Sequence, residues 1–337
     1  MKGYRFFFFL KILIIFSCSD NYIPKNTKVL FLSNRDSPKG EFDIFMTDIK
    51  SSKKINLTKN IKFVTSVSNP ILSQDNRTVL YTSFNKNQKF LCAIDVETKR
   101  NINVSELNLP SPEADFFDSN EKLIFVKKIN GVKQIFTSFK DGSNQKNISS
   151  TKQNEYSPII SLDNKKLAYI RTKKSKSSIV LRNLKNQEEY RFDVKGNSIN
   201  PSFTNDNNIV YESFLNGSYK IFIFYQKSKK IEQITTGDSN ANYPISVLND
   251  KSILFVSDGR GKKYKDLCLL NLETKKYEIL TDKLNMLNHN ASVSGDRETV
   301  VFESSKFNDS EIYMLNLIDK SVINLTQNIA WDCRPSF

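Results

Sequence analysis

Four polar residues have side chains suited to binding or proton transfer, and all four fall in segments that we expect to line a common channel: His289, Asp115, Glu155 and Asp332. His289 is the single histidine of the 337 residues, and one imidazole cannot reproduce the histidine clusters of metal-dependent sites. Carboxylates, in contrast, can act as general acid and base or bind a hard cation. We take these four residues as candidate binding residues at the channel mouth.

Recognisable catalytic motifs do not occur elsewhere in the sequence. The G-x-S-x-G pattern that carries a hydrolase nucleophile is absent. The glycine-rich stretch from Asp258 to Gly261 lies between two expected strands, so it predicts a hairpin bend and not a phosphate-binding loop. The sequence thus predicts no catalytic residue, no metal and no cofactor. Two alternatives stay open, a calcium site made of channel carboxylates and a hydrolase or lyase that uses them on saccharides or lactones.

An internal repeat supplies the elements that would position these residues. One aromatic position recurs seven times, at spacings of 42 to 50 residues, with an aliphatic residue two positions before each. The seven residues are Phe31, Tyr81, Phe125, Tyr169, Tyr211, Phe255 and Phe302. Apolar residues at period two predict a strand, and a repeat of forty-odd residues is typical of a β-propeller, in which each repeat forms one four-stranded blade.

Further features recur around this aromatic column. A second strand follows it across a short polar turn, and a later strand ends in an apolar residue followed by a small or acidic polar one, as in Leu57-Thr58. Most repeats also carry a proline and a polar turn ahead of the column, as in Pro70 to Asn76. We expect this proline to begin the innermost strand, where no partner needs its missing N–H.

The two ends of the chain complete the count of blades. The first repeat has no proline strand ahead of it, and the C-terminal residues Trp331 to Phe337 resemble that missing strand. We therefore predict an all-β fold, a seven-bladed β-propeller over residues 27–337. Its C-terminal strand would join the first blade as the innermost strand, which removes the exposed sheet edges that promote aggregation.

The repeat pattern resembles a known family. A blade that reads P-x-x-S-x-D-(N/G)-(K/R)-x-aliphatic-x-aromatic, then Ile-aromatic, then Leu-Thr resembles the WD-type repeats of the TolB propeller. Similar repeats build the propellers of dipeptidyl peptidases and prolyl oligopeptidases. TolB has an additional N-terminal α/β domain and six blades, whereas this chain shows seven repeats, so the resemblance does not extend to partnership with a Tol–Pal system. The resemblance implies an envelope-facing or periplasmic binding scaffold, because the fold is specific and the function is not.

The N-terminus predicts export and membrane attachment. Lys2 and Arg5 precede a mostly apolar run that Lys11 interrupts and that is shorter than the roughly 20 residues of a transmembrane helix. The residues from Ile15 to Cys18 resemble a bacterial lipobox, in which the cysteine accepts the lipid. We predict a signal peptide at residues 1–17, lipidation at Cys18 and a tether at residues 18–26, with ordinary cleavage or an uncleaved anchor as alternatives. The protein would face the periplasm, with the outer membrane favoured.

Charge and cysteine content limit the class of partner. The net charge is +14, and loss of three basic residues with the signal peptide leaves 47 basic and 36 acidic residues, or about +11. This charge favours anionic envelope polymers, but no basic tract is interleaved with aromatic residues as in a nucleic-acid groove. Cys92 and Cys268 share one column of different repeats and are expected to be buried and not bonded to each other.

These observations lead to one interpretation of the whole chain. We predict a monomeric, non-catalytic scaffold that binds a protein or an anionic envelope polymer at one face or at the channel mouth. It would contact the membrane through its N-terminal lipid and would not bind nucleic acid.

Overall fold

The computed structural model describes residues 27–37, 41–61, 66–85, 88–107, 109, 113–118, 121–149, 151–174, 176–194, 196–235, 243–249, 251–261, 263–306 and 309–337. The predicted signal peptide, Cys18 and the tether lie outside these residues. Within the described part, 28 strands form seven antiparallel sheets of four strands each. The same part contains one short 3-10 helix, η1 (Asp282–Leu284), between β23 and β24. In that same part, no helix has the length and apolar character needed to cross a membrane.

Each sheet is one blade. The innermost strands are β28 (Asp332–Ser336), β4 (Ser66–Leu72), β8 (Ala114–Phe117), β12 (Asn154–Ile160), β16 (Asn197–Phe203), β20 (Tyr243–Asn249) and β24 (Leu287–Val293). The second strands are β1 (Lys28–Ser33), β5 (Thr78–Asn85), β9 (Lys122–Ile129), β13 (Lys166–Lys173), β17 (Ile209–Leu215), β21 (Ser252–Ser257) and β25 (Thr299–Lys306). The third strands are β2 (Asp43–Asp48), β6 (Gln88–Asp95), β10 (Val132–Phe139), β14 (Lys176–Asn183), β18 (Ser218–Tyr225), β22 (Asp266–Asn271) and β26 (Asp309–Asn316). The outermost strands are β3 (Lys54–Asn56), β7 (Asn101–Glu106), β11 (Lys146–Asn147), β15 (Glu189–Asp193), β19 (Lys230–Gln233), β23 (Tyr277–Ile279) and β27 (Val322–Asn324).

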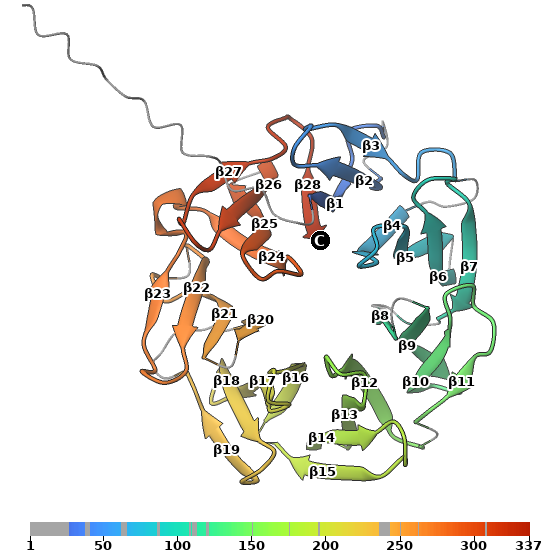
Figure 1. Ribbon diagram of the computed structural model, residues 1–337, viewed down its shortest axis with the longest axis vertical. Helices are drawn as coiled ribbons and strands as arrows, with labels where there is room; N and C mark the ends of the chain where they lie inside the picture. Colours follow the sequence, from blue (N-terminus) through green and yellow to red (C-terminus); the bar gives the residue numbers. More distant parts are fainter. Residues whose placement is uncertain are drawn as a thin grey trace, which may run out of the picture.

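The blades follow one another around a ring, which confirms the predicted seven-bladed propeller (Figure 1). The last strand, β28, pairs with β1, so the first blade contains both ends of the described chain. Two polar contacts reinforce this seam. Arg35 Nη2 donates to Asp332 Oδ2 at 2.7 Å, and the backbone N–H of Trp331 donates to Asn34 Oδ1 at 2.9 Å. The predicted closure is therefore confirmed.

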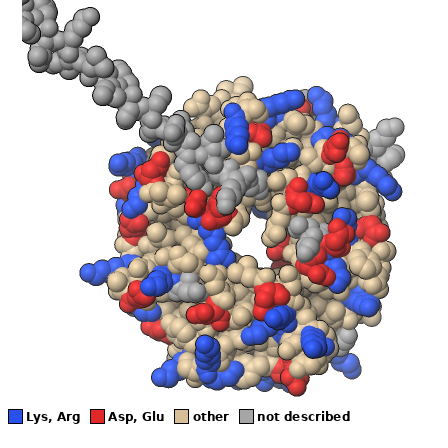
Figure 2. Space-filling view, viewed as in Figure 1, with Lys and Arg blue, Asp and Glu red and all other residues tan. Residues whose placement is uncertain are grey.

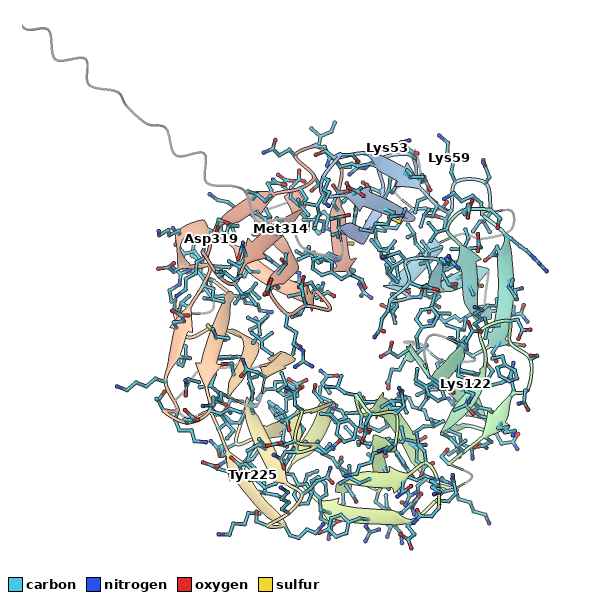
Figure 3. The ribbon with its side chains drawn as sticks, viewed as in Figure 1. Lys53, Lys59, Lys122, Tyr225, Met314 and Asp319 are labelled. Carbon is cyan, nitrogen blue, oxygen red and sulfur yellow. The ribbon has the colours of Figure 1, made fainter. Side chains whose placement is uncertain are left out.

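The hydrophobic core consists of seven clusters, each shared by two neighbouring blades. The aromatic column lies in the second strands, and each of its seven side chains is at most 1% exposed. Across the hairpin it faces the column that contains Cys92 and Cys268, which are buried free thiols as predicted. Side chains fill the spaces between neighbouring blades (Figure 3). A single blade therefore has no core of its own and depends on both neighbours.

The recurring hydroxyl residues of the repeat stabilise its turns. In five blades, the Thr or Ser after the outermost strand accepts a backbone N–H from near the start of the third strand, at 2.8 to 3.0 Å. These pairs are Thr58 with Ile44, Ser149 with Ile135, Thr235 with Ile221, Thr281 with Leu267 and Thr326 with Ile312. In the turn after the innermost strand, Ser73 donates to Asp75 and Ser161 donates to Asp163, each at 2.6 Å. The motif residues therefore serve the fold.

The prediction that the proline begins the innermost strand is wrong. Pro70, Pro158 and Pro201 lie inside their strands, where the register with the second strand shifts. The shifts span residues 68–71, 156–159 and 199–202. A β-bulge leaves one residue outside the ladder, and this accommodates a residue without an N–H as well as a strand end does.

Antiparallel connectivity gives the ring two different faces. The BC face carries the hairpins between second and third strands and the connections into the next blade. The AB face carries the turns between first and second strands and between third and fourth strands. Lys53 and Asp319, labelled in Figure 3, mark two turns of the AB face. The channel mouth is therefore surrounded by different loops, and by different residues, on the two faces.

Candidate functional site: the polar channel wall

The centre of the ring is open in the space-filling view, and the innermost strands form its wall (Figure 2). At the bulge of five of these strands stands a non-glycine residue in the left-handed region, with φ between 48° and 51°. These bulge residues are Asn69, Ser157, Asn200, Asn290 and Arg334. They are half-buried or exposed, whereas the proline that follows four of them is buried. The bulge thus packs the proline into the blade and directs a polar side chain toward the channel.

Glu303, on β25 behind the wall, is surrounded by hydrogen-bond donors. Its Oε2 accepts from Asn290 Nδ2 at 2.8 Å and from the backbone N–H of Arg334 at 3.1 Å. Its Oε1 accepts from the Ser310 hydroxyl at 3.0 Å and lies 3.2 Å from His289 Nε2. Burial alone would raise the pKa of Glu303, but the contacts with His289 and Asn290 outweigh it and lower the pKa to about 2. Glu303 is therefore a buried anion.

Arg334 extends this group of contacts across the closing seam. Its guanidinium Nη1 donates to Asn69 Oδ1 in the second blade, while its backbone N–H reaches Glu303 in the seventh. The His289 ring is also held on its other side, where Nδ1 lies 3.1 Å from the Leu287 carbonyl oxygen. The innermost strand β28 thereby connects three blades at the channel wall.

Glu212 occupies the matching position in β17 of the fifth blade, one residue after the aromatic column. Its Oε1 accepts from Asn200 Nδ2 at 2.5 Å, and its Oε2 has no hydrogen-bond partner among the described residues. The side chain is fully buried. Burial raises the pKa of Glu212 to about 8, and the contact with Asn200 offsets only part of this shift. Glu212 is therefore a neutral carboxylic acid at pH values below about 8.

Two of the four predicted binding residues reach solvent. The side chain of His289 is 33% exposed, although it also contacts Glu303. Asp115 is exposed on β8, yet the surrounding protein desolvates its carboxyl and raises its pKa to about 6, with the N–H of Phe116 opposing this shift. The Asp115 side chain is nevertheless exposed at the surface of β8, so it is available for contact.

The other two predicted residues are fully buried and bound by arginines. Glu155 Oε1 lies 2.5 Å from Arg171 Nε, and Asp332 Oδ2 lies 2.7 Å from Arg35 Nη2. The remaining oxygens, Glu155 Oε2 and Asp332 Oδ1, have no partner within the described part of the chain. Either carboxylate would have to leave its arginine, or act through it, to contact a ligand.

The four predicted residues lie in four different blades, each with partners of its own. Among the residues that the structure describes, no group of three or more His, Cys, Asp or Glu side chains is arranged to hold a metal ion. The shared role of His289, Asp115, Glu155 and Asp332 in binding stays a prediction. The wall itself offers amide, hydroxyl and guanidinium groups at fixed positions, which suits recognition of a polar ligand.

Sequence reasoning missed the bulge residues and the two glutamates behind the wall. Both had a signal in the sequence. Asn69, Ser157, Asn200 and Arg334 each directly precede the proline of their repeat. Glu212 and Glu303 follow the aromatic column, where the other repeats carry Leu32, Thr82, Val126, Ile170 and Val256. A glutamate in a column of buried positions needs a polar partner, and that requirement points to the wall.

Comparison with known proteins supports the fold. The family profile of the TolB beta propeller domain matches residues 119–265. A search of curated protein sequences gave no significant match. Among solved structures, TolB from Acinetobacter baumannii aligns with a TM-score of 0.57 at 13% identity, covering 92% of this chain and 66% of that chain. The β-propeller domain of the Trilobed protease from Pyrococcus furiosus aligns at 0.64 and 17% identity, covering 80% and 87%. A prolyl endopeptidase aligns at 0.70 and 11% identity, covering 92% and 49%.

The chain is therefore a TolB-like β-propeller in fold, and the resemblance predicted from its repeats is confirmed. At such low identity the likeness concerns the fold and not the activity. The chain spans 66% of the length of the TolB chain and about half, 49%, of the prolyl endopeptidase chain. What those whole proteins do is not carried over to this chain on the basis of the fold.

Proposed function

We propose that the chain is a non-catalytic binding scaffold of the cell envelope, held at the membrane by a lipid on Cys18. It binds a protein or an anionic envelope polymer at the channel mouth or at one face of the ring. The channel wall is the observation that carries this proposal. Its polar side chains are held by bulges and by hydrogen bonds to groups behind them, and preorganised polar groups lower the cost of binding.

The contacts of the wall favour binding over catalysis. Among the described residues, His289 contacts Glu303 and the Leu287 carbonyl, and no hydroxyl or thiol is hydrogen-bonded to it as a nucleophile would be. Glu212 and Glu303 have strongly shifted pKa values but are buried behind the wall. A general acid or base must reach its substrate, so these two side chains support the wall and do not act on a ligand.

The contact residues that we propose combine the predicted and the observed ones. His289, Asp115 and Arg334 reach solvent from innermost strands. Glu155 and Asp332 would act indirectly, by holding Arg171 and Arg35 in place. The centre of the ring is open in Figure 2, and a segment of a partner would contact the wall from the channel mouth.

Mass spectrometry of the mature N-terminus tests the membrane attachment. We expect the protein from native membranes to begin at an acylated Cys18 and to stay in the membrane fraction, and we expect Cys18→Ser to be released. An unmodified N-terminus after a different cleavage site would contradict the lipid anchor and would leave the binding role to be tested separately.

A capture experiment tests the binding role. Wild type, Arg334→Ala and Asp115→Ala are compared with Arg100→Ala, a matched control because Arg100 is an exposed residue in a turn of the AB face. We expect one partner to be retained by wild type and by the control, and to be weakened about tenfold by the channel variants, as for loss of a charged contact. Turnover of a glycan or peptide that disappears in Asp115→Ala would instead indicate an enzyme.

A further inference from the structure

Two neighbouring hairpins of the BC face carry lysines that oppose each other across the strands. The register of β9 and β10 places Lys128 opposite Lys133, and that of β13 and β14 places Lys173 opposite Lys176. Like charges in directly opposite positions destabilise a hairpin. In the matching hairpin of the seventh blade, lysine faces an acid, since Lys306 pairs with Asp309. Blades 3 and 4 therefore keep a repulsive arrangement that the fold does not require.

The two hairpins and the connection between them form one surface. The backbone N–H of Lys133 donates to Asn154 Oδ1 at 2.9 Å, and Asn154 pairs with Thr172, next to Lys173. Lys133 Nζ also lies 5.0 Å from the ring centroid of Tyr156 on the next blade. Blades 3 and 4 stand side by side in Figure 1. We call this surface the lysine patch: Lys128, Lys133, Lys152, Lys173, Lys174 and Lys176.

Acidic side chains do not neutralise the lysine patch. Five of its lysines are exposed and Lys133 is half-buried. None of the six forms an ion pair with an acidic side chain of the described chain, whereas at the opposite face of the same blade Lys122 pairs with Asp118 and Lys140 pairs with Glu121. Lys133 interacts electrostatically with the carboxyl of Glu113. Burial raises the pKa of Glu113, although its bond to the N–H of Ser157 and the charge of Lys133 oppose the shift.

We propose that the lysine patch binds an acidic polysaccharide, whose carboxylates take the place of the missing acidic side chains. This inference deepens the binding role proposed above and rests on it for the location of the polymer. Lysine ammonium groups are hydrated point charges on flexible stems, so they suit repeated carboxylates at variable spacing better than a single rigid anion. A net charge of about +11 on the chain without its signal peptide, from 47 basic and 36 acidic residues, adds long-range attraction to any such polymer.

Other polyanions fit the lysine patch less well. Single-stranded nucleic acid needs open aromatic faces on which bases stack, and the ring of Tyr156 is covered by Lys133. A membrane surface needs exposed apolar side chains among the basic ones. The exposed large apolar residues of the described chain include none from either hairpin tip. The lysine patch therefore offers positive charge, but no open aromatic ring for a base to stack on and no exposed large apolar side chain to insert into a membrane.

Binding of polygalacturonate to the purified full chain tests the proposal. The patch variant carries Lys128→Gln, Lys133→Gln, Lys173→Gln and Lys176→Gln. The control variant carries Lys50→Gln, Lys185→Gln, Lys227→Gln and Lys276→Gln, four exposed lysines in turns of the AB face. We expect wild type and control to bind with equal affinity and the patch variant to bind roughly tenfold to a hundredfold more weakly, as four exposed charges are removed. Added salt should weaken wild-type binding and abolish the difference.

Thermal unfolding distinguishes lost binding from lost folding. Because the substitutions remove like-charge pairs, the Tm of the patch variant should rise by about 1–2 °C. The polymer should raise the Tm of wild type and of the control more than that of the patch variant. Equal binding by patch variant and wild type overturns the proposal. So does binding of polyphosphate, single-stranded DNA or anionic vesicles without binding of polygalacturonate. Either result leaves the capture experiment on the channel residues unaffected.

Discussion

Blades 5 and 7 carry a glutamate at the same position of their second strands. The carboxyl in blade 7, Glu303, is ionised, whereas that in blade 5, Glu212, is protonated and neutral. Glu303 is 4% exposed with a pKa lowered to about 2, and Glu212 is fully buried with a pKa raised to about 8. Burial is thus nearly the same, and the difference lies in the donors around each carboxyl. The fold decides where such a side chain lies, and its neighbours decide whether it is ionised.

One donor to Glu303 comes from the strand that closes the ring, and its other contacts come from its own blade. Glu212 has Asn200 as its donor, and Glu303 has the equivalent Asn290. Three further contacts reach Glu303 from β24, β26 and the C-terminal strand β28; they come from His289, Ser310 and Arg334. The additional contacts, from its own blade first and from β28 next, therefore change a repeated position into a buried anion.

Removal of Glu303 should have the largest effect on stability. We expect Glu303→Ala to lower the free energy of unfolding by about 3–5 kcal/mol, because several buried donors lose their acceptor at once. Urea titration at about pH 6 measures this change. The matched control, Glu212→Ala, should cost less, about 1–3 kcal/mol, because one donor, Asn200, loses its acceptor. Equal losses in the two variants would remove the distinction between the blades.

Alkaline pH should destabilise the protein through Glu212. Its folded pKa of about 8 lies above the ordinary value of 4.5, so the folded state holds a proton that the unfolded state has released. The stabilisation is complete below about pH 4.5 and is lost as pH rises through about 8. Between about pH 5 and pH 9, we expect wild type to lose about 2–4 kcal/mol relative to Glu212→Gln. Parallel pH profiles of the two proteins would show that Glu212 ionises freely.

Acid pH should act on Glu303 with the opposite sign. Its folded pKa of about 2 lies below the ordinary value of 4.5, so its stabilisation is present above about pH 4.5 and declines as pH falls toward 2. The advantage of wild type over Glu303→Gln should therefore shrink by about 1–3 kcal/mol between about pH 5 and pH 2.5. Chemical denaturation across this range measures it, and a constant difference would indicate that Glu303 is already protonated at the higher pH.

Replacement of His289 should give the smallest effect. His289→Gln removes one of four contacts to Glu303, and its side chain is partly exposed. We expect a loss of about 0.5–1 kcal/mol at about pH 6 and a shift of the acid-side decline toward higher pH, because the pKa of Glu303 rises. The same substitution combined with Glu303→Gln should cost nothing further, and an additive loss would show that His289 acts elsewhere.

The fold was predictable because every blade repeats the same pattern of burial. The aromatic column and the terminal segment from Trp331 to Phe337 were sufficient to predict seven blades and their closure. The site was less predictable. Glu155 and Asp332 lie on innermost strands, as expected, but strand alternation turns their side chains away from the channel toward arginines. Bulges at the prolines also change which residues face the channel, and strand periodicity alone does not reveal a bulge.

By itself the sequence determined the strands, the repeat and the closing of the ring, because hydrophobic period and turn residues act between neighbours along the chain. Only the tertiary structure decided that Glu303 is charged while Glu212 is neutral, and that lysines of two hairpins form one patch. Ionisation and surface potential depend on donors and charges in space. Here these groups come from other strands and other blades. Arg334, for example, contacts Glu303 and Asn69, which lie 31 and 265 positions away in the sequence.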